Sequence, residues 1–348
     1  VIISPFLFQQ KRGVESFTIS LANKLIEDSR VKVIIYTWKG RNRDYTEKLN
    51  NNILIRTLPF LRYFQKIQAF VFYNIWLRLD NPSIVIINFF YHGESLLSKS
   101  LNYILVLHSP PSQIPNRYKF IKQKINSFKS LEIVAVSNYV KRESKSIFPN
   151  HKINVIHNGI NLNQFKLKKM NDSPVLRIVT LSSLEKRKRI QNVILALKKI
   201  RNSNFIFHIY GDGKYKKNIE NLINQENLQK YVKLKGITNE PESIFCDYDV
   251  FILISKGEAL PIAPLEAMSS GLPLIVSNEE PFNEIVSKDC GFLIDPNDQQ
   301  QIVESILSLK DKIKRKKLGN SARLKVKQYF SDSDMRDMYI RLIFKNFA

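Results

Sequence analysis

Short apolar runs alternate with helical patterns along the whole chain. Such runs are typical of buried strands, and helices between them cover the faces of a parallel sheet. The predicted strands of the first half are Val1–Ser4, Val31–Thr37, Ile84–Asn88, Tyr103–His108 and Ile133–Ser137. Those of the second half are Leu176–Leu181, Phe205–Tyr210, Val232–Lys235, Val250–Ile254, Leu274–Ser277 and Gly291–Ile294. The alternation therefore predicts an α/β protein.

Chain length and one turn signal divide this pattern in two. The 348 residues exceed the roughly 250–300 that a single hydrophobic core usually organises. Asn158-Gly159 is a strong turn signal and precedes a polar stretch. We therefore predict two domains, over residues 1–163 and 164–331.

The charge of the chain is large and uneven. Residues 1–170 hold 26 Lys and Arg against 9 Asp and Glu, a net +17, and the remainder hold 28 against 22, a net +6. A cationic first half indicates an anionic partner, such as a phospholipid surface, a lipid-pyrophosphate acceptor or nucleic acid. A coding bias toward Lys and Asn is an alternative source of part of the excess.

Several classes of protein are disfavoured by what the sequence lacks. No apolar run reaches the about 18 residues of a membrane-spanning helix, and no secretory leader opens the chain. Cys246 and Cys290 have no metal-type spacing, and the five histidines form no cluster. We therefore expect a cytoplasmic protein with reduced thiols and without a metal site.

The segment after Val250–Ile254 has the start and stop residues of a short helix. Pro264 suits the first turn, where a missing N–H costs nothing, and Gly271 suits the position that closes the helix. We expect Glu266 in the first turn and Glu258 in the loop before it. A surface helix with solvated glutamates is the alternative reading.

The start of this helix suits a nucleotide sugar. Backbone N–H groups near Ile262 and Ala263 have no intrahelical partner and form a ready anion site. A carboxylate at Glu266 can hydrogen-bond the ribose diol, and Glu258 would lie near the transferred sugar. The pyrophosphate would then occupy the helix start.

Cationic and glycine-containing loops follow other predicted strands. Lys188 lies in a basic run after Leu176–Leu181, and cations there would oppose the charge that grows on a diphosphate leaving group. His108 ends a strand, where ligands of open α/β sheets gather. Glycines such as Gly13 and Gly211 let a backbone approach a ligand closely. The alternatives are a solvated helix start, a structural histidine and ordinary turns.

Taken together, these motifs resemble the family 4 (group 1) glycosyltransferases. Glu258 and Glu266 match the Glu-x7-Glu signature, Lys188 matches the lysine of the Gly-Arg-Leu-x-x-x-Lys-Gly element, and Gly13 matches the second glycine of the Gly-Gly-Val-Glu element. Tyr210-Gly-Asp-Gly213 and Lys235-Gly-Ile237 resemble the Gly-x-Gly turn and the segment beside the nucleotide base.

Three positions depart from the family pattern. Ser183 stands where an arginine is usual, Arg12 replaces the first glycine, and Asn161 replaces an aspartate. The first departure removes one phosphate contact, for which Lys186, Arg187 or Arg189 would have to compensate.

The resemblance implies a retaining enzyme with the GT-B fold, in which two Rossmann-like domains face each other across a cleft. It also implies that a terminal helix over residues 332–348 crosses back to the first domain. By the same resemblance, Glu258, Lys188 and His108 are catalytic, Glu266, Ile262, Ala263, Ser183, Gly211 and Gly236 bind the donor, and Gly13 and Arg12 form an acceptor-side or phosphate loop.

The implied mechanism uses neither a covalent nucleophile nor a metal. The acceptor would attack from the face that the diphosphate leaves, and the leaving phosphate oxygen would take the acceptor proton. The sequence Cys246-Asp-Tyr-Asp249 contains an Asp-x-Asp pair, which holds a metal in other glycosyltransferases. We reject that role, because an acid just before a strand is ordinary and this family binds no catalytic metal.

Two segments bear on membrane association. Arg117–Lys129 combines Ile121, Ile125 and Phe128 with basic residues, as a basic amphipathic helix does. Tyr63–Leu79 is rich in aromatic residues. Either segment could pack on the first domain's sheet, dock on an anionic membrane, or do both with opposite faces.

The sequence thus predicts a glycosyltransferase that moves a sugar from a nucleoside-diphosphate sugar to a hydroxyl of a lipid-linked or anionic glycan. Its setting would be cell-envelope assembly, with the protein cytoplasmic or peripheral on the membrane's inner face. Two alternatives remain: a donor-binding protein without turnover, suggested by Arg12 and Ser183, and a nucleic-acid-binding protein, suggested by charge alone. We expect no nucleic-acid partner, because no reading module is present.

Overall fold

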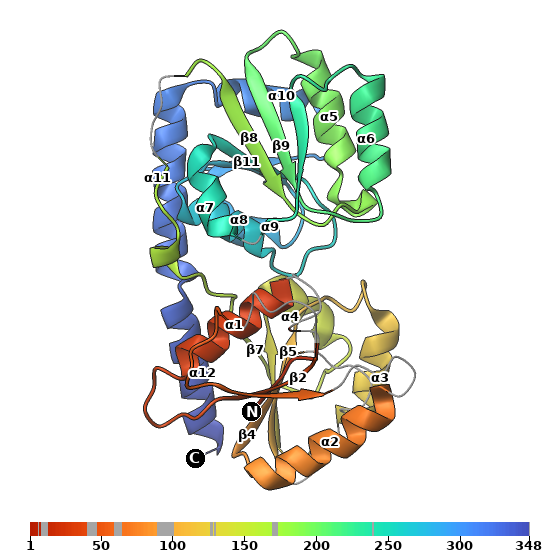
Figure 1. The fold of residues 1–348 in the computed structure, drawn as a ribbon, viewed down its shortest axis with the longest axis vertical. Helices are drawn as coiled ribbons and strands as arrows, with labels where there is room; N and C mark the ends of the chain where they lie inside the picture. The colour runs from red at the N-terminus through yellow and green to blue at the C-terminus, as the bar shows by residue number, and fades with distance from the viewer. Residues whose placement is uncertain are drawn as a thin grey trace. The chain divides into compact units, whose positions relative to one another are not determined.

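The computed structural model describes residues 1–5, 7, 13–39, 47–58, 65–88, 101–125, 128, 130–168, 173–238 and 240–347, without the side chains of 65–70 and 346–347. The chain forms two compact units. Unit 1 comprises Val1–Gly159 and Asp332–Ala348, and unit 2 comprises Ile160–Ser331. Each unit is built on its own parallel sheet with interleaved helices (Figure 1), which confirms the α/β class.

Unit 1 contains a seven-stranded parallel sheet with strand order β3-β2-β1-β4-β5-β6-β7. The strands are β1 (Ile2–Ile3), β2 (Ile34–Trp38), β3 (Leu54–Leu58), β4 (Ile84–Ile87), β5 (Asn102–Leu107), β6 (Ser130–Ala135) and β7 (Ile153–Val155). The five predicted strands of this half are confirmed, but β3 and β7 were not predicted. Both lie at sheet edges, where partial exposure weakens the apolar pattern.

The helices of unit 1 cover both faces of its sheet. They are α1 (Gly13–Leu25), α2 (Gln65–Asp80), α3 (Pro115–Ile125), α4 (Asn138–Lys145) and α12 (Asp332–Phe347). Right-handed crossovers place α1 on one face and α2, α3 and α4 on the other, because the connections run in opposite directions from the centre of the sheet.

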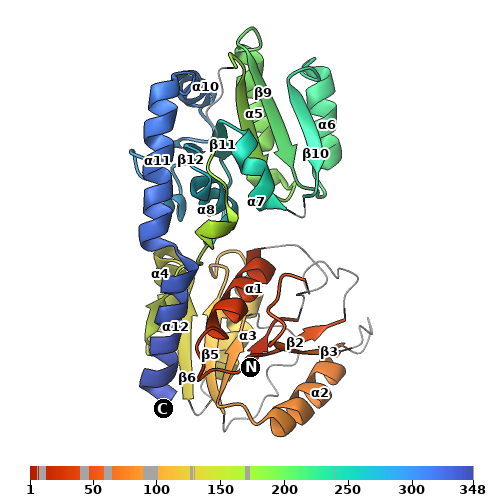
Figure 2. The same cartoon turned by 60° about the vertical axis from the view of Figure 1, so that its left-hand side comes forward.

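The terminal helix α12 belongs to unit 1, as the family resemblance implied. It packs beside α1 (Figure 2). Arg336 forms an ion pair with Glu27 at 3.0 Å, and the rings of Phe17 and Tyr339 lie 6.3 Å apart. The chain therefore returns to its first unit after completing the second.

Unit 2 contains a six-stranded parallel sheet with strand order β10-β9-β8-β11-β12-β13. The strands are β8 (Leu176–Leu181), β9 (Phe205–Tyr210), β10 (Val232–Gly236), β11 (Val250–Leu253), β12 (Leu274–Ser277) and β13 (Gly291–Ile294). All six were predicted to within one residue, since each is a compact apolar run bounded by polar or turn residues.

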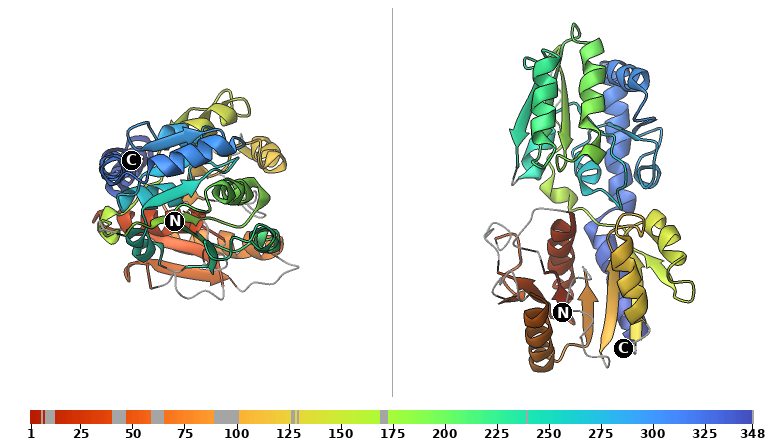
Figure 3. Two further views of the ribbon diagram at one scale, coloured as in Figure 1. Left: turned by 90° about the horizontal axis from the view of Figure 1, so that it is seen from above. Right: turned by 90° about the vertical axis from the view of Figure 1, so that its right-hand side faces the viewer.

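Helices and short turns complete unit 2. The helices are α5 (Ile190–Lys199), α6 (Lys216–Gln225), α7 (Pro241–Ile244), α8 (Ile262–Ser269), α9 (Phe282–Ile285), α10 (Gln299–Ser308) and α11 (Lys312–Tyr329), and the 3-10 turns are η3 (Leu162–Gln164), η4 (Lys186–Lys188) and η5 (Phe245–Asp247). Helices α5 and α6 lie side by side against one face of the sheet (Figure 3). Ile178, Phe207, Ile252 and Leu197 belong to the fully buried core of this unit.

Helix α11 approaches α8 closely because of one glycine. A Cβ atom on Gly319 would lie 2.0 Å from the carbonyl oxygen of Gly271. Gly271 itself has a φ of +78°, the left-handed conformation expected just past a helix end. The predicted closing role of Gly271 is therefore confirmed.

None of the described helices has the length and apolar character of a membrane span.

Asp249 of the Asp-x-Asp pair lies in a buried ionic cluster. Its carboxylate accepts hydrogen bonds from the Lys168 ammonium and, at 2.8 Å and 3.2 Å, from the backbone N–H and Nε of Arg177. Burial opposes ionisation of Asp249, but these cationic and N–H donors outweigh it and lower the pKa of the carboxyl. Asp249 thus ties the start of β11 to β8 and to the segment that enters unit 2.

Replacing Asp249 with asparagine should destabilise unit 2 by about 3 kcal/mol, because it leaves Lys168 buried without its counter-charge. The measurement is urea unfolding of Asp249→Asn. Its matched control is Asp247→Asn, an exposed acid of the same motif, which should change the free energy of unfolding by at most about 0.5 kcal/mol. Equal effects of the two substitutions would contradict the structural role of Asp249.

Candidate functional site

The strand order of unit 2 creates one topological switch point. Strands β8 and β11 are neighbours, and the chain leaves them toward opposite sides of the sheet. The crevice outside the carboxyl ends of such strands is the usual ligand position in open α/β sheets. The loop after β8 carries Lys188, and the loop after β11 carries Glu258. Two predicted site residues therefore come together at this position.

Lys188 and Glu258 form a buried ion pair. The Lys188 Nζ atom donates to Glu258 Oε1 at 2.5 Å, and the two residues are 8% and 9% exposed. They are 70 positions apart in the sequence. Lys188 ends the 3-10 turn η4, and Arg189 follows in the left-handed conformation, so the backbone bends there before α5 begins. This bend holds the lysine over the switch point.

Arg187 joins the same cluster from its exposed side. Its Nη1 atom lies 3.3 Å from Glu258 Oε1 and donates to the Gly257 carbonyl at 3.2 Å, while its Nε pairs with Glu185 at 2.8 Å. The backbone N–H of Lys256 donates to the Arg187 carbonyl at 2.9 Å. The two loops are therefore fastened to each other through backbone as well as side chains.

The cluster keeps Glu258 ionised. Burial by itself would raise the pKa of this carboxyl, but the charges of Lys188 and Arg187 and the Lys188 hydrogen bond outweigh it, so the pKa lies below its ordinary value. Glu258 is therefore a carboxylate at neutral pH, suited to accept hydrogen bonds from sugar hydroxyls. It is not poised as a general acid.

Helix α8 begins next to this cluster. It starts at Ile262, and Pro261 caps it without a side-chain hydrogen bond to its first N–H groups. The cap residue therefore does not occupy the N–H groups of Ile262 and Ala263, and the anion site expected there stays a prediction. Pro264 is the third helical residue, so its missing N–H costs no intrahelical bond, as predicted.

The position of Glu266 differs from the prediction. The sequence placed it in the first turn, whereas α8 starts two residues before Pro264 and Glu266 falls in the second turn. A proline is tolerated at any of the first three positions of a helix, so the motif did not fix where the helix begins. Glu266 is half-buried and one turn in from the helix start.

The glycine turn after β9 packs against the segment that carries Ser183. A Cβ atom on Gly211, which has a φ of +135°, would lie 1.8 Å from the Ser182 carbonyl oxygen, and one on Gly213 would lie 2.4 Å from the Leu184 carbonyl oxygen. Leu184 N–H also donates to the Asp212 carbonyl at 2.9 Å. These glycines allow two loops to touch, which is a structural reason for the Gly-x-Gly turn.

Gly236 and Ser183 lie on the outer parts of the same region. Gly236 has a φ of +73°, and its carbonyl accepts the Gly211 N–H at 2.7 Å, while a Cβ atom on it would meet open space. Ser183 is exposed. The Ser183 side chain and the space beside the Gly236 backbone are thus accessible, as a donor-binding role requires.

The remaining predicted residues belong to unit 1. Gly13 is exposed and begins α1, and Arg12 lies outside the described residues. His108 directly follows β5, and the Phe17 ring stands edge-on to it with centroids 4.7 Å apart. Its Nε2 atom is buried and has no hydrogen-bond partner among the described residues. Burial lowers the pKa of His108 to about 3, so the ring is neutral at neutral pH.

One polar group in unit 2 was not anticipated. His208 Nδ1 lies 2.7 Å from the Tyr248 hydroxyl, which lies 3.1 Å from the hydroxyl of Tyr210. Burial, with help from Lys235 and Lys233, lowers the pKa of His208. No local pattern signals this group, because His208 and Tyr248 are 40 positions apart.

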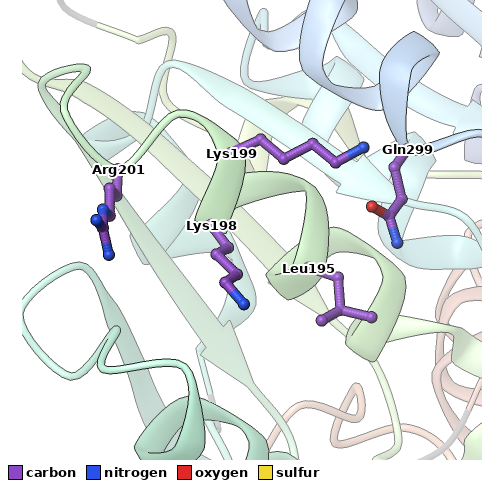
Figure 4. Close-up of a pocket in the computed structure, with 5 residues that line it drawn as sticks. All are labelled: Leu195, Lys198, Lys199, Arg201 and Gln299. Carbon is purple, nitrogen blue, oxygen red and sulfur yellow. The ribbon is translucent and has the colours of Figure 1, made fainter.

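A separate cavity of about 470 Å³ is lined by Leu195, Lys198, Lys199, Arg201 and Gln299 (Figure 4). It lies at the C-terminal end of α5, whereas Lys188 precedes the N-terminal end of that helix. Lys198 is also paired with Glu226 at 2.5 Å. The cavity is therefore distinct from the predicted donor site.

Comparison with known proteins identifies the chain's relatives. A family model described as glycosyl transferases group 1 matches residues 162–325, and one described as glycosyltransferase family 4 matches residues 11–164. An uncharacterized glycosyltransferase of Methanocaldococcus jannaschii is 26% identical over 340 residues, which cover 92% of each chain.

Relatives with named activities match over shorter stretches. A UDP-Gal:alpha-D-GlcNAc-diphosphoundecaprenol alpha-1,3-galactosyltransferase of Escherichia coli is 33% identical over 144 residues, 40% of this chain and 37% of that protein. A poly(ribitol-phosphate) alpha-N-acetylglucosaminyltransferase of Staphylococcus aureus is 26% identical over 223 residues, 63% of this chain and 41% of that protein.

Two solved structures share the fold over nearly the whole chain. The Anabaena protein HepE, in complex with UDP and glucose, has a TM-score of 0.84 at 16% identity and covers 99% of this chain and 98% of its own. A glycosyltransferase from Rickettsia africae has a TM-score of 0.81 at 21% identity with the same coverage. These likenesses confirm the GT-B fold class predicted from the sequence.

Replacing Gly211 with alanine should destabilise unit 2 by about 3 kcal/mol, because its φ is strained for alanine and its Cβ would clash with Ser182. Gly236→Ala is the matched control, since it has a positive φ but open space around the Cβ, and should cost about 1 kcal/mol. Denaturant unfolding of both variants checks the difference. A Gly211 variant as stable as the Gly236 variant would show that the two loops are not in close contact.

Proposed function

The chain belongs to the group 1 glycosyltransferases, and we propose that it transfers a sugar from a nucleoside-diphosphate sugar to a hydroxyl of a lipid-linked or anionic glycan acceptor. The observation that carries this proposal is the Lys188–Glu258 pair at the β8/β11 switch point, beside the start of α8. It combines a cation for the leaving diphosphate, a carboxylate for the sugar and free helix N–H groups in one place.

The diphosphate would lie between Lys188 and the start of α8. As the glycosidic bond breaks, negative charge grows on the departing phosphate oxygen. Lys188 and the N–H groups of Ile262 and Ala263 would stabilise that charge without having to move into place. Arg187 lies close enough to Glu258 to add a second cation where the family arginine is replaced by Ser183.

Glu258 and Glu266 would orient the donor. The ionised Glu258 can accept hydrogen bonds from the sugar hydroxyls, and Glu266 can accept from the ribose diol. With the donor fixed in this way, the acceptor hydroxyl would attack from the face that the diphosphate leaves. The leaving phosphate oxygen would take the acceptor proton, which retains the anomeric configuration. Catalysis would then rest on positioning and electrostatics.

No metal is part of this proposal. The cationic task of a divalent ion would fall to Lys188, Arg187 and the α8 start. Asp249 of the Asp-x-Asp pair is already held by Lys168 and Arg177, which favours a structural role for it.

The proposal for the acceptor is supported by the net charge of unit 1 and by the names of two relatives. Unit 1 holds 26 Lys and Arg against 12 Asp and Glu, a net charge of +14, which suits an anionic acceptor. Two of the relatives carry a lipid diphosphate and a poly(ribitol phosphate) in their names. We place the reaction in cell-envelope polysaccharide or glycolipid assembly, with the protein peripheral on the inner face of the membrane and His108 on the acceptor side.

A thermal-shift screen against UDP-, GDP-, ADP- and dTDP-sugars, with and without EDTA, tests the donor site. We expect at least one donor to raise the unfolding midpoint, and the rise to survive EDTA, because the diphosphate is held by protein cations. Ligand at 100 times its Kd stabilises by about 2.7 kcal/mol, a readily measured change. No stabilisation at millimolar donor would contradict the proposal and favour a charge-driven nucleic-acid-binding protein. Donor binding without transfer to any acceptor would favour a protein that has lost turnover.

Replacing Lys188 with alanine should lower kcat by about two orders of magnitude or more, because it removes a cation that meets developing charge. Steady-state transfer kinetics check this result. The control is Lys317→Ala, an exposed lysine of α11, for which kcat should stay within about two-fold of the parent value. If both variants kept the parent kcat, the assignment of Lys188 would be wrong.

A further inference from the structure

Helix α2 is apolar on two opposite sides. Toward the sheet, it buries Tyr73 and Leu77, and Trp76 packs edge-on against the Tyr36 ring with centroids 5.1 Å apart. These contacts attach α2 to the sheet of unit 1. Within the predicted aromatic segment Tyr63–Leu79, Tyr73, Trp76 and Leu77 thus pack toward the sheet, whereas Tyr63 and Phe64 lie outside the described residues.

The opposite side of α2 presents a stripe of large apolar side chains to solvent. Two of its residues are adjacent and the others follow at intervals of three or four positions, which places all four within one broad helix face. The exposed fractions are 41% for Val71, 37% for Phe72, 46% for Ile75 and 69% for Leu79. We call these four residues the α2 stripe. It spans eight residues of rise, about 12 Å.

The edge strand of the sheet adds another exposed apolar side chain on the α2 side. Leu54 on edge strand β3 is 49% exposed. It lies two residues before Arg56, which reaches α2 through Asp80 at 2.7 Å, so both side chains leave β3 on the α2 side. Exposed apolar side chains gathered on one helix face, on a unit with a buried core of its own, indicate a contact with something outside the chain.

The charges around the α2 stripe are positive. Arg78 is exposed beside the stripe, and Asp80, the acidic residue of α2, is engaged by Arg56 and by the Tyr36 hydroxyl at 2.6 Å. On the same side of the sheet, α3 buries Ile121 and Ile125 and exposes Lys119 and Lys122. Unit 1 carries a net charge of +14.

We propose that the α2 stripe is inserted into the interface of an anionic phospholipid bilayer. Apolar side chains flanked by cations match the two parts of that interface, acyl chains below and acidic headgroups above. A second copy of the chain is a poorer occupant. A symmetric contact would bring two units of +14 together and would set each Arg78 near its counterpart.

The inference rests on the proposed function in one respect: the membrane is the surface that would carry a lipid-linked acceptor. Insertion needs neither donor nor catalysis. Docking and transfer can therefore fail independently, and binding is measured without either substrate.

Co-sedimentation with vesicles tests the inference directly. The full chain is mixed with vesicles of phosphatidylglycerol and phosphatidylcholine, or of phosphatidylcholine alone. We expect binding to the anionic vesicles. The triple variant Phe72→Ser, Ile75→Ser and Leu79→Ser should lower the partition coefficient at least about ten-fold, since each lost methylene group weakens insertion. The matched control is Ile313→Ser with Leu324→Ser on α11, at 82% and 65% exposure, which should leave vesicle binding unchanged.

Tryptophan fluorescence reports whether α2 itself enters the lipid. The chain has two tryptophans, so Trp38→Phe leaves Trp76 on α2 as the single reporter. Brominated lipids should quench it in the Trp38→Phe chain and not when the triple substitution is added to that chain. The triple substitution removes exposed side chains, so the unfolding midpoint and the donor-induced stabilisation should match those of the same chain without it. Vesicle binding unaffected by the triple substitution would overturn the inference. So would a stripe-dependent dimer in ultracentrifugation without vesicle binding.

Discussion

The ion pair between Lys188 and Glu258 is the interaction on which the candidate site depends. It joins two loops that are distant in sequence and adjacent in space, because β8 and β11 are neighbours at the switch point of the unit 2 sheet. Each charge alone would be costly to bury, by about 3–5 kcal/mol when its partner is removed. Each charge therefore stabilises the buried position of the other. The lysine is thus already positioned for a ligand that carries negative charge. The Lys256–Arg187 backbone bond fastens the same two loops, and the close packing of Gly211 on Ser182 fixes the loop after β8 to the loop after β9.

Much of unit 2 could be predicted from the sequence, because its strands are compact apolar runs and its turns carry glycine or proline where the backbone needs them. The edge strands of unit 1 could not. Strand β3 contains Arg56 and Thr57, and β7 has only three residues, so neither shows the pattern of a buried strand. The motifs identified Lys188 and Glu258 individually, but their contact depends on strand order, which local patterns do not encode. Likewise, the partners of Asp249 lie in separate segments, so only the structure distinguishes its ionic cluster from a metal motif.

The two units differ in their charges, and this difference matches the separate roles proposed for them. Unit 2 holds balanced ion pairs at its switch point, and the donor is expected there. Unit 1 has the cationic excess, the neutral and largely buried His108, and an exposed apolar stripe on α2. An enzyme whose acceptor is anchored in a bilayer benefits from a unit that binds the bilayer itself, because the search for acceptor is then confined to a surface. The net charge of +14 would draw unit 1 to that surface, and the stripe would hold it there.

The most direct test of the central claim is a crystal structure of the chain with its nucleoside diphosphate bound. The account predicts that the diphosphate lies within hydrogen-bond distance of Lys188 Nζ and of the N–H groups at the start of α8. A diphosphate bound elsewhere in unit 2, for example in the cavity lined by Lys199 and Arg201, with the Lys188–Glu258 pair untouched, would contradict it.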